Sequence, residues 1–187
     1  MNPDRRRRQL LELGTELFAR HGYEKLSMAR IAREAGISKA LLFHYFPSKQ
    51  AYFAATLEQA AAELAEETEP DPAKPPLEQL AASLDAYLGW VERHAAAYEK
   101  LIRSVGAVPE VRELVERVRD ETADRILAGH EPAPVLRAAV RGWLWFMDGA
   151  VLDWIEHRDI DRERLHALLL GTLLGAARAA GEPLTPG

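Results

Sequence analysis

The chain has 187 residues, 48% of them hydrophobic, and carries 24 Lys or Arg against 29 Asp or Glu, a net charge of −5. It has no cysteine, which excludes disulfides, thiolate metal sites and cysteine nucleophiles. No apolar run approaches the roughly 20 residues that span a bilayer. Glu12 also interrupts the apolar residues after the first arginines, unlike a signal peptide. Good helix formers dominate, so we expect a cytoplasmic, all-α protein with no membrane partner.

Positive charge is concentrated near the N-terminus. Residues 1–50 hold ten basic and five acidic side chains, a net charge of +5, which leaves −10 for residues 51–187. This asymmetry suits a chain that touches nucleic acid at one end only. The run Arg5–Arg8 predicts contacts by Arg5 and Arg6 along phosphates or in a minor groove, as basic arms make. The alternative is a merely solvated terminus.

Residues 27–49 have the pattern of two short helices around a tight turn, followed at once by a third helix. The predicted boundaries are Ser27 as N-cap and Gly36 as the end of the first helix, Ser38 as N-cap and Pro47 as the end of the second, and Ser48 as N-cap of the third. This is the helix-turn-helix layout, whose second helix enters the major groove of DNA. Here that helix is Lys39–Tyr45, and it carries groups suited to phosphates and base edges.

The alternative for each of these residues is ordinary packing or an ordinary surface role. Leu42, Phe46, Ile31 and Ile37 are predicted to be core, whereas the ordered set of motifs and the positive charge favour DNA binding. The predicted DNA-binding residues are Ser27, Lys39, Ala40, Leu41, Phe43, His44, Tyr45, Lys49, Arg5 and Arg6.

Over roughly residues 5 to 55, several motifs occur in the order and at the spacing of a known protein family. They are an amphipathic first helix with Leu10, Leu13, Gly14, Leu17, Phe18 and His21, the turn His21-Gly22-Tyr23, then IAREAGIS and LLFHYFPSK. This segment resembles the DNA-binding domain of the TetR family of bacterial transcriptional regulators. The resemblance implies a three-helix DNA-binding domain over residues 1–50 and a helical effector-binding and dimerisation domain over residues 51–187.

The segment departs from the family pattern in two places. Phe43 stands where the family usually has a tyrosine whose hydroxyl reaches a phosphate, so one positioning contact should be weaker. Ala40-Leu41 replaces a common small polar pair, so Leu41 could meet a thymine methyl where a hydroxyl would have hydrogen-bonded.

The remaining chain predicts a series of helices separated by proline and glycine. The predicted helices are Ser48 to about Thr68, Leu77–His94, Ala95–Val105, Pro109–Leu127, about Pro134–Glu156 and about Asp161–Ala180, with breaks at Glu69–Pro76 and Gly129–Pro132. The last two are apolar nearly all round, which requires burial on more than one side. We expect them to form half of a four-helix dimer interface; the alternative is a large monomer core. The predicted interface residues are Trp145, Leu152, Leu169, Gly171, Leu173 and Gly175.

The aromatic residues concentrate in the C-terminal domain and predict an effector site. A pocket between helices is mostly apolar, with a few polar groups that orient the ligand, so we expect a small hydrophobic or aromatic effector. The predicted residues are Trp90, His94, Tyr98, Trp143, Met147 and Asp148. Asp148 interrupts an apolar stretch and would meet either the ligand or an arginine such as Arg141.

No pattern indicates catalysis. The six histidines form no metal-ligand spacing, and neither a phosphate-binding glycine loop nor a nucleophile elbow is present. We expect no cofactor and no metal. The sequence predicts a dimeric regulator, a repressor by the family's usual mode, that a small effector releases from a palindromic operator in double-stranded DNA. The alternative is a DNA-binding protein without an inducer, either architectural or controlled by a protein partner.

Overall fold

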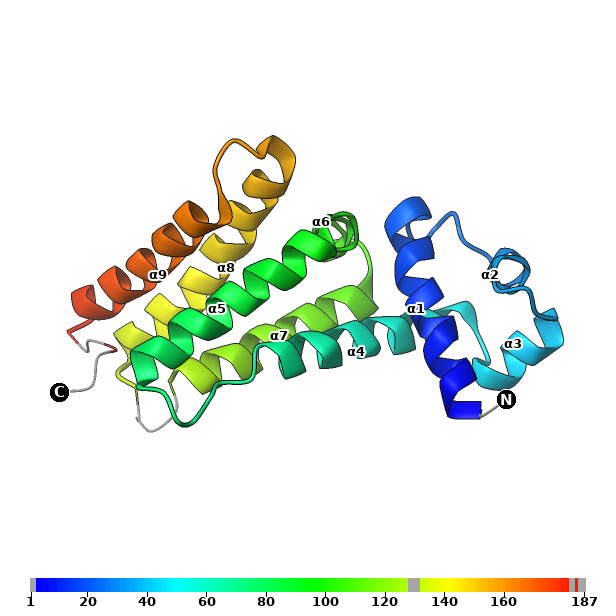
Figure 1. The fold of residues 1–187 in the computed structure, drawn as a ribbon, viewed down its shortest axis with the longest axis horizontal. Coiled ribbons are helices and arrows are strands. Elements are labelled where there is room, and N and C mark those ends of the chain that lie inside the picture. Colours follow the sequence, from blue (N-terminus) through cyan, green and yellow to red (C-terminus); the bar gives the residue numbers. More distant parts are fainter. Residues whose placement is uncertain (1–2, 128–131, 182–183, 185–187) are drawn as a thin grey trace. The chain divides into compact units, whose positions relative to one another are not determined.

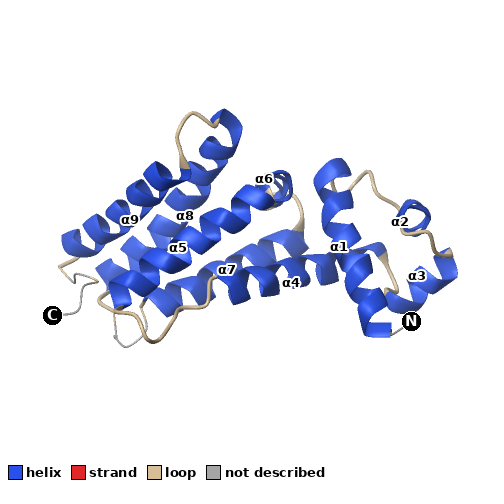
Figure 2. Ribbon diagram, viewed as in Figure 1, coloured by secondary structure: helices blue, strands red, loops and turns tan. Residues whose placement is uncertain are grey.

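The computed structural model describes residues 3–127, 132–181 and 184, and within them every regular element is a helix (Figures 1 and 2). The predicted all-α class is therefore confirmed. The helices are α1 (Pro3–His21), α2 (Met28–Glu34), α3 (Lys39–Tyr45), α4 (Lys49–Glu67), α5 (Pro76–Arg93), α6 (Ala95–Ser104), α7 (Pro109–Ile126), α8 (Pro134–His157) and α9 (Arg162–Ala179). The break predicted at residues 129–131 lies outside the described residues.

Serine hydroxyls begin three of the helices, as predicted. Ser27 Oγ accepts a hydrogen bond from the Arg30 amide (3.2 Å), and Ser38 Oγ accepts one from the Leu41 amide (3.1 Å). Ser48 Oγ accepts one from the Ala51 amide (3.0 Å). Each such cap stabilises its helix by about 1 kcal/mol. Gly36 has a φ of +63°, the left-handed conformation that lets the chain turn sharply out of α2.

The chain divides into two compact units. Unit 1 comprises residues 1–63 and 96–114, and unit 2 comprises residues 64–95 and 115–187. Residues 96–114, which contain α6 and the start of α7, therefore cluster with the N-terminal helices. The sequence held no signal for this return of the chain, and the division after residue 50 stays a prediction.

Unit 1 is built around the contact between α1 and α4. Tyr52 of α4 is fully buried, and its hydroxyl donates to the carbonyl oxygen of Leu10 in α1. Its ring lies 4.9 Å from that of Phe46 and 6.0 Å from that of Phe18, between centroids. Burial raises the pKa of the Tyr52 phenol, which keeps it a hydrogen-bond donor.

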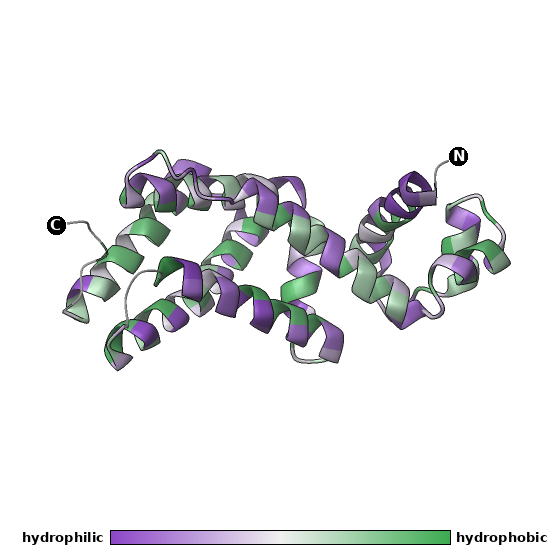
Figure 3. Cartoon of the chain, turned by 90° about the horizontal axis from the view of Figure 1, so that it is seen from below, coloured by the Kyte–Doolittle hydropathy of each residue, from purple (hydrophilic) through white to green (hydrophobic). Residues whose placement is uncertain are grey.

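Unit 2 is a bundle in which α9 packs on both α8 and α5 (Figure 1). Two buried tryptophans of α8 join this helix, through their indole N–H groups, to α9 and to the loop before α9. Trp143 Nε1 donates to the Leu169 carbonyl and Trp154 Nε1 to the Ile160 carbonyl, both at 2.9 Å. Figure 3 shows the hydrophobic residues of the helices alternating with hydrophilic ones, as expected for amphipathic helices with one apolar side.

Replacing Gly14 tests the close approach of α1 to α4. A Cβ atom there would lie 2.5 Å from Thr56 Oγ1 and 2.8 Å from Tyr52 Oη, so Gly14→Ala should lower the free energy of unfolding by about 1–3 kcal/mol. Gly142→Ala in α8 is the control, because its added Cβ meets nothing within 4 Å and should stabilise the helix by up to about 1 kcal/mol. Denaturant unfolding measures both, and an unchanged midpoint for Gly14→Ala would contradict the close crossing.

Candidate nucleic-acid interface

α2, the turn at Gly36 and α3 form a helix-turn-helix within unit 1. The turn is closed by backbone hydrogen bonds from Gly36 to Arg33 (3.1 Å) and from Ile37 to Ala32 (3.0 Å). Leu42 and Phe46 are 0% and 2% exposed and fix the inner side of α3. The seven residues of α3 therefore have one defined orientation in the unit.

The outer side of α3 is exposed and carries most of the predicted DNA-binding residues. Lys39, Ala40, Leu41, Phe43 and His44 are all exposed, whereas Tyr45 is half-buried. At about 100° per residue, Ala40 and His44 lie opposite the buried side, with Leu41 and Phe43 on the two flanks. This arrangement gives one short helix an outer face with both charged and apolar side chains.

Two further predicted residues of this region, Ser27 and Lys49, have structural roles. The Ser27 hydroxyl caps α2, as described above. Lys49 Nζ donates to the Tyr23 carbonyl oxygen at 3.1 Å and lies 4.0 Å from the centre of the Tyr23 ring. Lys39 is free of such a backbone contact, and its ammonium lies 5.6 Å from the Phe43 ring centre. Lys49 thus joins the start of α4 to the α1–α2 turn, a role that spacing alone did not indicate.

The arginine run lies on the first turns of α1, the strongly hydrophilic segment near the N-terminus in Figure 3. Arg5 is exposed and Arg6 is half-buried. The run is helical and forms part of α1. Contact of these two arginines with phosphates stays a prediction.

His21 and Arg30 form a polar contact that sequence reasoning missed. Arg30 Nη2 lies 3.0 Å from His21 Nε2. Because a guanidinium only donates, His21 Nε2 must accept, which requires a neutral ring. Desolvation and the nearby positive charges of Arg30 and Arg20 lower the pKa of His21. The contact fastens the end of α1 to α2 and thereby positions the helix-turn-helix.

The six predicted effector residues are divided between the two units. Tyr98 is buried in unit 1, whereas the other five belong to unit 2. Trp90 is 6% exposed, with its ring centre 4.5 Å from that of His94. Trp90 Nε1 is buried without a hydrogen-bond partner among the described residues. Met147 is half-buried on α8.

Asp148 is buried and paired with an arginine, the alternative that the sequence left open. Its partner is Arg119 of α7, whose guanidinium also lies 3.9 Å from the Trp145 ring centre. Arg141, which we named as a possible partner, instead pairs with Asp120 at 2.8 Å. The indole of Trp143 is likewise satisfied by the Leu169 carbonyl. These two predicted effector residues thus have internal partners.

The predicted dimer residues separate into buried and exposed groups. Leu169 and Leu173 are 0% and 1% exposed within the single chain, so they belong to its own core and not to a surface available to a partner. Their assignment is corrected, because their stripe of α9 faces α8. Trp145 is 63% exposed, Leu152 is half-buried, and Gly171 and Gly175 are exposed.

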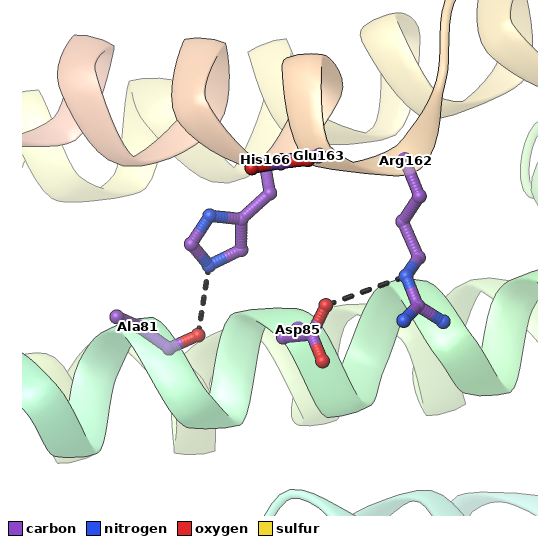
Figure 4. Close-up of a pocket in the computed structure, with 5 residues that line it drawn as sticks. All are labelled: Ala81, Asp85, Arg162, Glu163 and His166. Carbon is purple, nitrogen blue, oxygen red and sulfur yellow. Dashed lines mark hydrogen bonds and ion pairs between the residues drawn. The ribbon is translucent and has the colours of Figure 1, made fainter.

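A surface pocket of about 360 Å³ lies between α5 and α9 (Figure 4). Its lining is Ala81, Asp85, Arg162, Glu163 and His166, a polar set that includes none of the predicted effector residues. His166 Nε2 lies 2.8 Å from the Ala81 carbonyl oxygen, and Arg162 Nε lies 3.3 Å from Asp85 Oδ1. These two contacts join α9 to α5.

Metal sites and membrane-spanning helices are both absent from residues 3–127, 132–181 and 184. No group of three or more His, Cys, Asp or Glu side chains there is arranged to hold a metal ion. Over the same residues, no helix combines the length and apolar character needed to cross a membrane.

The geometry of unit 1 defines a helix-turn-helix protein whose second helix presents its outer face to solvent. Comparisons with known proteins agree. The family model for bacterial regulatory proteins of the tetR family matches residues 10–56, and the model for the tetracyclin repressor-like C-terminal domain matches residues 76–175. The chain belongs to the TetR family and is a DNA-binding transcriptional regulator, as the resemblance predicted.

Individual relatives are similar over part of the chain. The nucleoid occlusion factor SlmA of Mannheimia succiniciproducens is 42% identical over 60 residues, 32% of this chain and 28% of that protein. The transcriptional repressor AcnR of Corynebacterium diphtheriae is 38% identical over 61 residues, 33% of this chain and 32% of that protein. The chain thus covers less than a third of the length of either relative. A crystal structure of a tetR-family regulator from Streptomyces coelicolor matches with a TM-score of 0.85 and 28% identity over 97% of this chain and 84% of that one.

The His21–Arg30 contact predicts a pH dependence. Since the pKa of His21 is lowered on folding, its contribution to stability is present above the unfolded value of roughly 6.5 and is lost as the pH falls below it. His21→Gln keeps an acceptor for Arg30 and should remove this loss between pH 7 and 5, as measured by thermal unfolding.

His157→Gln is the matched control, because the pKa of His157 is shifted in the opposite direction to that of His21. The hydrogen bond to the Asp153 backbone and the Asp153 carboxylate raise the pKa of His157, so its contribution is present at low pH and lost as the pH rises. An acid loss in His21→Gln equal to that of the unmodified protein would contradict the neutral His21–Arg30 contact.

Proposed function

We propose that this regulator is a dimeric repressor that binds a palindromic operator and is released by a small, mostly hydrophobic effector. The observation that carries the proposal is the exposed outer face of α3, set on the positive part of the molecule. Unit 1 has 13 basic and 10 acidic residues, a net charge of +3, whereas unit 2 has 11 and 19, a net charge of −8. A duplex is attracted to the first unit and repelled by the second.

Exposed apolar side chains on α8 and α9 support the dimer. Trp145 and Phe146 of α8 are 63% and 43% exposed, and Leu168 of α9 is 47% exposed. Gly171 and Gly175 lie exposed on α9 and would let a second helix approach closely. A two-fold dimer also supplies the two recognition helices that a palindrome requires.

The unpaired indole N–H of Trp90 supports the effector. A buried donor without a partner costs about 1–3 kcal/mol. A ligand with an apolar body and one acceptor atom would relieve that cost and would bind one arrangement of unit 2 better than another. The effector acts only through this difference in affinity. Helix α4 runs from unit 1 into unit 2, and residues 96–114 return to unit 1, so a change in unit 2 has covalent routes to the DNA-binding helices.

A second candidate is a DNA-binding protein without an inducer, controlled by a protein partner or purely architectural. Two observations favour it: the similarity of 60 residues to a nucleoid occlusion factor, and the internal partners of Trp143 and Asp148. It differs from the first candidate in the response of DNA binding to small molecules.

Selection of bound duplexes from a random library, at a stated near-physiological salt concentration, tests the proposal. A palindromic site that binds two chains in sedimentation analysis is the expected result, and a library of hydrophobic compounds should then contain members that lower the affinity. Salt-sensitive binding with no shared sequence would contradict the repressor and favour the second candidate.

Two lysine variants separate contact with DNA from support of the fold. Lys39→Ala should weaken DNA binding, reduce the salt dependence by about one ion and leave the melting temperature unchanged, because Lys39 is exposed. Lys49→Ala should lower both the DNA affinity and the melting temperature, because it also removes the contact with Tyr23. Fluorescence anisotropy against salt and thermal unfolding measure the two effects. A lower melting temperature for Lys39→Ala with unchanged DNA affinity would contradict the assignment.

Trp90→Phe tests the effector contact. The change removes the unpaired N–H and keeps an aromatic ring, so the fold should be at least as stable, while the affinity for an effector found in the screen should fall about three- to tenfold. Calorimetric titration measures the affinity, with Trp145→Phe as the control that alters an exposed indole. Equal affinities in Trp90→Phe and the unmodified protein would exclude an acceptor contact at Trp90.

A further inference from the structure

We propose that the Ala40-Leu41 step of α3 recognises thymine methyl groups, so that each operator half-site contains thymines selected for their C5 methyl and not for a hydrogen bond. The inference rests on the proposed function, in which α3 enters the major groove. Beyond that function, it names the kind of base edge that Ala40 and Leu41 recognise.

The exposure of Leu41 is the first observation. Seven large apolar side chains stay exposed among the described residues: Leu41, Phe43, Val135, Trp145, Phe146, Ile160 and Leu168. Only two of these belong to unit 1, and both lie on the seven-residue helix α3. Leu41 is 39% and Phe43 is 40% exposed. Single exposed apolar residues are common, but two on the outer face of one short helix indicate a surface that is covered when the protein binds its partner.

The backbone that carries these side chains has a defined orientation. The Leu41 amide donates to the Ser38 hydroxyl in the first turn of α3, and Leu42 beside it is fully buried. Phe43 is partly covered by the Lys39 ammonium on its own flank of the helix. Ala40 lies near the middle of the outer face, next to Leu41. The two side chains leave the helix about 100° apart, so Ala40 presents a small apolar surface at the middle of the outer face and Leu41 a larger one on its flank.

Chemistry decides which base fits this step. In the major groove, guanine, cytosine and adenine present hydrogen-bond donors and acceptors, whereas thymine adds a methyl group. Ala40 and Leu41 have no side-chain donor or acceptor, so a purely polar base edge against them would lose its water without gaining a hydrogen bond. Moving a thymine methyl group out of water and against these two side chains lowers the free energy. The net positive charge of unit 1 makes a duplex, and not a protein, the expected occupant of this face.

The test removes only the methyl group. After selection of the operator, each thymine of a half-site is replaced in turn by deoxyuridine, which pairs in the same way. At the thymine that faces Leu41 the affinity should fall about three- to fivefold, as expected for the loss of one buried methyl group. Leu41→Ala should make binding less sensitive to that replacement, with an unchanged salt dependence. Val135→Ala, which truncates a 61% exposed side chain in unit 2, should keep the full sensitivity.

Each outcome separates this inference from the proposed function. Specific binding that is indifferent to deoxyuridine at every position would overturn the methyl contact and leave the repressor proposal standing. Sensitivity to deoxyuridine that persists in full in both Leu41→Ala and Ala40→Gly would also overturn it, because other side chains would then recognise the methyl. Failure to select any site would refute the proposed function itself.

Discussion

The close crossing of α1 and α4 at Gly14 is the constraint on which unit 1 depends. The glycine allows the Tyr52 hydroxyl and Thr56 to approach the α1 backbone, and Tyr52 then donates to the Leu10 carbonyl. Because Phe46 packs edge-on against Tyr52, the same crossing fixes the end of α3. The side chain of Lys49 and the contact of His21 with Arg30 fasten the surrounding turns. The orientation of α3 therefore depends on the buried side chain of Tyr52.

The same contacts join the DNA-binding helices to the rest of the chain. α4 carries Tyr52 and continues to Glu67, beyond the end of the first stretch of unit 1 at residue 63. The return of residues 96–114 brings the charges of Lys100 and Glu110 close enough to act on the pKa values of His21 and Tyr23. In the proposed mechanism, α4 and α6 are therefore the segments through which a change would reach the groups that hold the helix-turn-helix in place. In unit 2, the Arg119–Asp148 pair joins α7 to α8, and the Trp143 hydrogen bond joins α8 to α9.

The sequence predicted what local physical chemistry controls. Ser27, Ser38 and Ser48 cap helices because a short hydroxyl can reach an amide three residues on, and Gly36 turns the chain because it tolerates positive φ. The sequence could not show which apolar residues of α8 and α9 face each other. Leu169 and Leu173 therefore looked like interface residues although they fill the chain's own core. Nor could spacing reveal contacts between distant segments, such as Arg119 with Asp148, or the placement of Tyr98 in unit 1. The DNA-binding set followed from motifs in order, which is why its helix was found and the structural roles of Lys49 and Arg30 were not.

The central claim is that the outer face of α3 meets DNA while the exposed face of α8 meets a second copy of the chain. Two phenylalanines of similar exposure allow one direct measurement: Phe43 of α3, 40% exposed, and Phe146 of α8, 43% exposed. Each is replaced in turn by the photoreactive p-benzoylphenylalanine, and the protein is irradiated with the selected duplex. We expect a protein–DNA crosslink from position 43 and a protein–protein crosslink from position 146. A crosslink to DNA from position 146, or none from position 43 under conditions of full binding, would contradict it.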